Sequence, residues 1–185
     1  MLAPERRGHG RYTEAVRRFT RENPSRRANL LFLIIFGVAF GFAEAAVVYY
    51  LRILLHFRDG YSIAHYKVLL NLGFITFVSP VHSLIVNHRV CDIEVARESA
   101  TLIMLICLAF VAARSWRQRT GAFLVSFACW DLSYYVFLKL LEDWPRSVMT
   151  KDVFFLIPVT SIGPVITPIV ISILLLSLGL KLFAD

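Results

Sequence analysis

The chain has 185 residues, of which 57% are hydrophobic, and its formal net charge is +7. That apolar fraction excludes a soluble domain of this size, whose surface must be largely polar. The charge does not indicate nucleic acid binding, because eight arginines lie within residues 1–28 and are not spread over a folded face. We therefore expect a polytopic, all-α integral membrane protein.

The arginine-rich start of the chain predicts its orientation. A basic block beside an apolar span is the usual retention signal for the cytoplasmic side, and it also attracts anionic lipid headgroups. We expect residues 1–28 to form a basic cytoplasmic segment and residues 29–185 a single transmembrane helical domain, in a bacterial-type cytoplasmic membrane. Ala43-Glu44-Ala45 has the small-x-small pattern of a cleavage site. The apolar run continues beyond it through "AVVYYL", so we predict an uncleaved first span.

Four segments have the length and apolarity of transmembrane helices. The segment 68–86 is ambiguous, because Asn71, Pro80 and His82 interrupt it. We expect it to be re-entrant or interfacial, with a fifth span as the alternative. The four predicted spans cover residues 30–52, 94–114, 120–141 and 153–182.

The depth of the acidic residues in the membrane distinguishes an arrangement of four spans from one of five. Lys and Arg divide 12 to 7 between the two sides in both arrangements, leaving out Arg97. At about 1.5 Å per residue, four spans place Glu44 roughly 21 Å, Asp131 roughly 17 Å and Glu98 roughly 24 Å from the cytoplasmic side. The three acids then meet in the outer half of the membrane. Because buried charges need partners, this favours four spans with both termini cytoplasmic.

The second predicted span begins with a polar stripe. Glu94, Arg97, Glu98 and Thr101 are spaced i, i+3, i+4 and i+7, so they share one helix face. The rest of the segment is apolar, and such a stripe must face protein or water. Arg97 is expected to pair with Glu94 three residues earlier.

The first span carries an isolated acid beside a seam of small residues. Gly37 and Gly41 let another helix approach closely, and Glu44 and Arg52 lie on roughly the same face. A glutamate at this depth needs Arg97, Arg52, a bound cation or a proton.

The third span contributes the sequence "WDLSYY". Tyr134 and Tyr135 follow Asp131 at i+3 and i+4, where their hydroxyls can donate to it. Trp130 and the two tyrosines are expected to form an aromatic wall.

The fourth predicted span is irregular. Pro158, Pro164 and Pro168 predict a kinked helix whose freed carbonyls are covered by protein or line a wet cavity. Asp152, which precedes this span, is expected to cap it.

Three interpretations of the acidic residues remain open: a structural salt-bridge network, a cation or proton site of a transporter or channel-like protein, and an enzyme site. We favour the cation or proton site. The alternative is a non-catalytic subunit or assembly factor of a larger membrane complex, and a weaker one is a membrane enzyme acting on lipid or quinone. The predicted ion- or proton-binding residues are Glu44, Glu94, Glu98 and Asp131, supported by Arg97, Arg52, Tyr134, Tyr135 and Trp130.

The sequence carries no motif that names a reaction or a cofactor, so whether the protein is an enzyme stays open. Glu44, Glu98 and Asp131 offer oxygen ligands, which suit a hard divalent cation. No histidine lies in the four predicted spans, so a haem is not expected. The expected partners are the lipid bilayer and a homo-oligomer or a larger membrane complex, and no nucleic acid.

Overall fold

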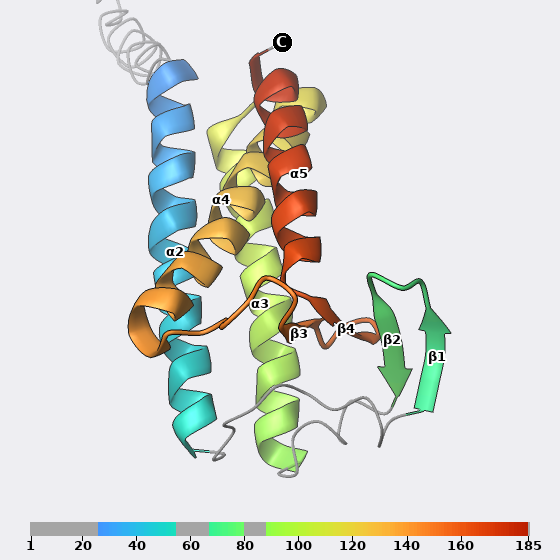
Figure 1. Ribbon diagram of the computed structural model, residues 1–185. Helices are drawn as coiled ribbons and strands as arrows, with labels where there is room; N and C mark the ends of the chain where they lie inside the picture. The colour runs from blue at the N-terminus through green and yellow to red at the C-terminus, as the bar shows by residue number, and fades with distance from the viewer. Residues whose placement is uncertain (1–25, 55–66, 80–87, 185) are drawn as a thin grey trace, which may run out of the picture. The chain divides into compact units, whose positions relative to one another are not determined.

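The computed structural model describes residues 26–54, 67–79 and 88–184. The chain divides into two units, Met1–Phe32 and Leu33–Asp185. Within the second unit the helices run alternately up and down (Figure 1), and two β-hairpins form one small sheet. The helices are α2 (Arg26–Leu54), whose first seven residues belong to the first unit, α3 (His88–Ala112), α4 (Trp116–Glu142) and α5 (Ile166–Ala184).

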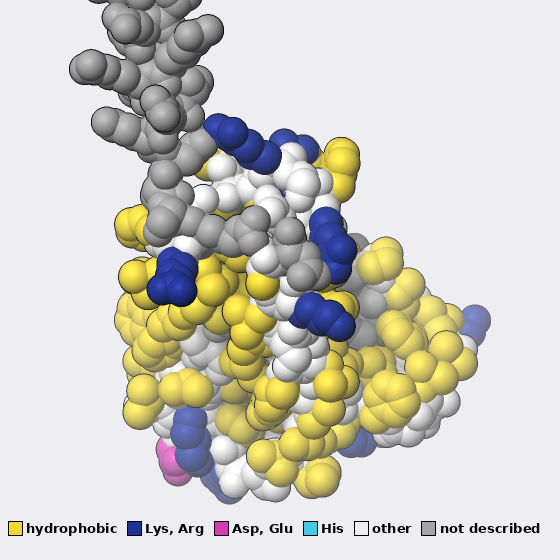
Figure 2. Space-filling model, turned by 90° about the horizontal axis from the view of Figure 1, so that it is seen from above, with side chains coloured by type: hydrophobic (Ala, Val, Ile, Leu, Met, Phe, Trp, Pro, Cys, Tyr) yellow, Lys and Arg dark blue, Asp and Glu magenta, His cyan; other side chains and the backbone are white. Residues whose placement is uncertain are grey.

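All four helices are long and apolar enough to cross a membrane, which suggests a membrane location. Their outward side chains agree with this, since many large apolar residues are exposed, such as Phe32, Ile103 and Leu174. Figure 2 views the molecule from the end at which α5 finishes, and basic side chains lie there among apolar ones. Arg114, Arg117 and Lys181 are exposed at the helix ends on this side.

The tight packing of α2 against α4 follows from the small residues predicted to form a seam. A Cβ placed on Gly41 would lie 2.0 Å from Ser133 Oγ and 2.7 Å from the carbonyl oxygen of Trp130. A Cβ on Gly37 would lie 2.7 Å from Cys129 Cβ. Only glycine therefore allows the helices to approach this closely, and the approach brings Glu44 toward α4.

The prediction of a mainly helical fold with four long apolar helices is confirmed, but the all-α prediction missed a four-stranded antiparallel sheet, which the described residues form in the order β1-β2-β4-β3. Thr76 of β2 pairs with Ile162 of β4, and this long-range pairing joins the two hairpins. Val78 and Ile162 are almost fully buried in the sheet. The strands are β1 (Lys67–Asn71), β2 (Thr76–Ser79), β3 (Lys151–Phe155) and β4 (Thr160–Pro164).

The ambiguous segment 68–86 does not form a fifth helical span, because residues 67–79 fold as the β1–β2 hairpin. Asn71 ends β1, and its Oδ1 accepts a hydrogen bond of 2.8 Å from the amide of Gly73. Gly73 has a φ of 85°, a conformation that favours glycine in tight turns. Residues 80–86 lie outside the described part of the chain. A re-entrant or interfacial position for this hairpin stays a prediction.

The fourth predicted span, 153–182, is also wrong in its first half. Residues 151–164 form the β3–β4 hairpin, and α5 begins only at Ile166. Pro158 lies between the strands and Pro164 at the end of β4, where neither interrupts a helix. Pro168 lies in the first turn of α5, where a backbone N–H has no helical partner to lose. The prolines thus lie before α5 or in its first turn, and they do not kink the helix.

Candidate functional site

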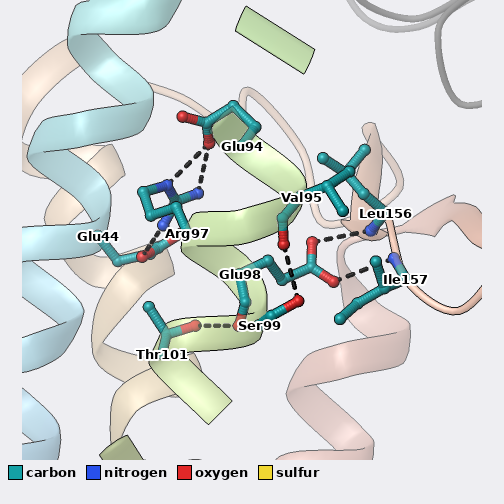
Figure 3. Close-up of polar contacts among 9 residues, drawn as sticks. All are labelled: Glu44, Glu94, Val95, Arg97, Glu98, Ser99, Thr101, Leu156 and Ile157. Atoms are coloured by element: carbon teal, nitrogen blue, oxygen red, sulfur yellow. Dashed lines mark hydrogen bonds and ion pairs between the residues drawn. The ribbon is translucent and has the colours of Figure 1, made fainter. Parts of the chain in front are cut away.

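Arg97 links α3 to α2 through two glutamates (Figure 3). Its Nη1 lies 2.5 Å from Glu44 Oε2, and its Nη2 lies 2.7 Å from Glu94 Oε2. Arg97 Nε also donates to Glu94 Oε2 at 2.8 Å. One guanidinium therefore binds an acid on its own helix and an acid on the neighbouring helix, as the spacing of the polar stripe predicted for Glu94.

Glu98 points away from that pair toward the β3–β4 hairpin (Figure 3). Its Oε2 accepts a hydrogen bond of 2.8 Å from the amide of Leu156, and its Oε1 one of 3.1 Å from the amide of Ile157. Thr101 completes the stripe, but its hydroxyl donates to the carbonyl oxygen of Glu98 in the same helix. The stripe thus serves two neighbours, α2 and the hairpin.

Asp131 on α4 is held by α5. Ser172 Oγ donates a hydrogen bond of 2.7 Å to Asp131 Oδ2. Within the described part of the chain, Asp131 Oδ1 accepts no hydrogen bond and Asp131 has no arginine or lysine partner. Tyr135 does not donate to it as expected but to Asp152 Oδ2, at 3.2 Å. The ring of Tyr134 packs edge-on against that of Tyr135, with centroids 4.9 Å apart.

Asp152 is a site residue that the sequence did not reveal, and its predicted role as a helix cap is wrong. It lies on β3, two residues into the strand, with 2% of its surface exposed. Burial raises the pKa of its carboxyl to about 6, although Arg52 and Tyr135 act in the opposite direction. In the sequence, Asp152 follows a polar loop, and only the pairing of β3 with β4 places its side chain in the interior.

Arg52, at the C-terminal end of α2, holds three elements together. It forms an ion pair with Glu142 at the end of α4, and its Nη2 lies 3.7 Å from Asp152 Oδ1. Its guanidinium carbon stands 3.8 Å from the centroid of the Trp144 ring, a cation–π contact. Arg52 therefore neutralises acids near the end of the bundle.

A cavity of about 140 Å³ lies between these groups. It is lined by the second half of α2, the first half of α3, the middle of α4 and β3, with apolar side chains such as Val48 and Phe155 between the polar ones. All nine residues predicted for the site line it: Glu44, Arg52, Glu94, Arg97, Glu98, Trp130, Asp131, Tyr134 and Tyr135.

The cavity wall is unbalanced in charge. Glu44, Glu94, Glu98, Asp131 and Asp152 contribute five carboxyl groups, whereas Arg52 and Arg97 contribute two guanidinium groups. If every group were ionised, three negative charges would remain. Such an excess between apolar helices is unfavourable unless protons or a cation reduce it.

The acids surround the cavity without converging on one point. Among the described residues, no group of three or more His, Cys, Asp or Glu side chains is placed to hold a metal ion. Glu44, Glu98 and Asp131, the predicted metal ligands, instead contact Arg97, backbone amides and Ser172 respectively. The indole N–H of Trp130, another wall residue, is buried without a hydrogen-bond acceptor in the described part of the chain.

Comparison with known proteins gave no relative: no family model, no curated protein and no solved structure matches the chain.

Proposed function

We propose that this protein binds a cation or protons in the cavity between its helices, as part of a transport function. The observation that carries the proposal is the excess of five carboxyl groups over two guanidinium groups on one cavity wall. Charged groups among membrane-crossing helices are costly, and they mark ion and proton paths where they occur.

The roles of the acids follow from their partners. Glu44 and Glu94 share Arg97, and Asp152 lies near Arg52, so a nearby guanidinium group compensates the negative charge of each of these three acids. Glu98 and Asp131 form no ion pair in the described part of the chain, and their partners there are hydrogen-bond donors, two amides for Glu98 and one hydroxyl for Asp131. They are therefore the groups that gain most from a proton or a cation, and Asp131 gains more because its Oδ1 accepts no hydrogen bond from the described residues.

The test is uptake into proteoliposomes that contain the purified protein, followed with a pH-sensitive dye for protons, a cation-sensitive dye for metal ions and a radiolabelled alkylammonium ion for organic cations. We expect wild-type protein to transport faster than empty liposomes and Asp131→Asn to reduce that rate by roughly tenfold or more, since about 1.4 kcal/mol of binding free energy corresponds to tenfold.

Asp143→Asn is the matched control. This substitution makes the same chemical change at an exposed position, where Asp143 pairs with Lys139 outside the cavity. Its backbone is left-handed, with a φ of 54°, which asparagine adopts readily. This variant should transport at the wild-type rate. Equal transport by wild type, Asp131→Asn and empty liposomes would contradict the proposal, as would full activity in Asp131→Asn.

A further inference from the structure

We propose that the cation taken by this cavity is a small organic ammonium ion with an apolar body. The inference deepens the proposed function and rests on it. Its basis is the combination of the cavity's size, its aromatic and apolar wall, and the placement of two acids that form no ion pair in the described part of the chain.

The size of the cavity points to a molecule and not to a bare ion. Its volume is about 140 Å³. An engineered apolar cavity of about 150 Å³ in another protein holds benzene, so this one accommodates a ligand of roughly six non-hydrogen atoms. A proton needs no such space. A metal ion needs converging ligands, and no such group exists among the described residues.

The wall suits the apolar body and the charge of such a ligand. Val48, Leu51, Phe154 and Phe155 offer apolar surface, and burying the CH₂ groups of a ligand against such surface stabilises the complex. The same wall contains the rings of Trp130, Tyr134 and Tyr135. Aromatic faces attract ammonium groups, and the attraction strengthens when water is excluded.

The acids supply the counter-charge. Glu98 on α3 and Asp131 on α4 both line the cavity, and neither forms an ion pair with a lysine or arginine within residues 26–54, 67–79 and 88–184. Asp131 Oδ1 also accepts no hydrogen bond there. An ammonium group has three N–H donors, so one carboxylate oxygen and the neighbouring rings suffice to bind it.

The experiment compares two probes of equal heavy-atom number that differ in charge, n-butylammonium and 1-butanol. Each is titrated by calorimetry into the full-length protein in mild detergent, with Na⁺, K⁺, Mg²⁺ and Ca²⁺ as further probes. We expect n-butylammonium to bind to wild-type protein at least roughly tenfold more tightly than 1-butanol and than each metal ion. Asp131→Asn should lose this preference for charge, and Asp143→Asn should keep it.

Equal binding of the two probes, or the absence of binding by n-butylammonium, would overturn the inference. The wild-type comparison needs no variant, so it decides the question even if Asp131→Asn fails to fold. Failure here is distinguishable from failure of the proposed function. Metal-ion or proton transport that depends on Asp131, without n-butylammonium binding, would leave the proposed function standing and remove the ammonium ion as its substrate.

Discussion

The acids of the site differ in how neighbouring groups compensate their negative charge. Arg97 serves Glu44 and Glu94 at short distances, whereas Arg52 stands 3.7 Å from Asp152 and is shared with Glu142. Asp152 is consequently buried with its arginine partner farther away than that of Glu44 or Glu94, and burial raises its pKa to about 6. Asp143, exposed beside Lys139, shows the opposite behaviour, because its hydrogen bond to Lys139 lowers its pKa.

The raised pKa of Asp152 makes folding stability depend on pH. The folded-state value of about 6 lies above the ordinary value of 3.8, so the folded protein holds this proton more tightly than the unfolded chain. This contribution is complete below about pH 4 and is lost as pH rises through about 6. At 1.36 kcal/mol per pKa unit, the loss is on the order of 3 kcal/mol.

Asp152→Asn, which mimics the protonated carboxyl, should therefore gain stability relative to wild type between pH 4.5 and pH 7.5. The measurement is the difference in thermal unfolding midpoint between the two proteins at each pH. Asp143→Asn is the control, and its midpoint should not rise relative to wild type over the same range. An unchanged difference between wild type and Asp152→Asn at the two pH values would show that the proton on Asp152 does not couple to folding.

The side chain of Glu98 connects a helix to the sheet. Glu98 of α3 accepts from the amides that follow β3, so it orders the turn between β3 and β4. Glu98→Ala should leave both amides without an acceptor, and a hydrogen bond to a charged group contributes about 1.5–3 kcal/mol. We expect hydrogen exchange at Leu156 and Ile157 to accelerate by roughly tenfold or more, since tenfold corresponds to about 1.4 kcal/mol.

Glu94→Ala is the matched control for this exchange experiment. Glu94 lies one helical turn earlier on the same helix and contacts Arg97, not the hairpin. Its removal should leave exchange at Leu156 and Ile157 unchanged. Equal exchange in wild type and Glu98→Ala would mean that the β3–β4 turn is ordered without the carboxylate.

The helices could be predicted from the sequence, but the sheet could not. Hydropathy over about 20 residues identifies a span, and the spacing of Glu94, Arg97 and Glu98 within one helix is a local property. The β2–β4 pairing of Thr76 with Ile162 joins segments that are distant in the sequence, and no local sequence pattern predicts it. Asp152 was missed for this reason, because its burial depends on that sheet. All nine predicted site residues nevertheless line one cavity, since helix periodicity alone places most of them.

The alternating direction of the helices determines which loops of the second unit lie at the same end. In the second unit, the turn between α3 and α4 lies at the same end as the C-terminus of α5, and the segment after α4 lies toward the opposite end (Figure 1). In the four-span arrangement expected from the sequence, Lys and Arg divide 12 to 7, leaving out Arg97, and the larger number is on the side expected for the arginine-rich residues 1–28. The positive-inside rule then predicts that the α3–α4 turn is cytoplasmic and that the cavity acids lie nearer the outer surface.

Cysteine labelling in intact cells tests this orientation. In a background in which Cys91, Cys107 and Cys129 are replaced by serine, Met149→Cys should react with a membrane-impermeant maleimide. Met149 is 66% exposed in the segment after α4. Arg114→Cys, in the exposed α3–α4 turn, should react only after the membrane is permeabilised. The reverse pattern would invert the orientation, and it would place the cavity acids, with the cation they are proposed to bind, nearer the cytoplasm.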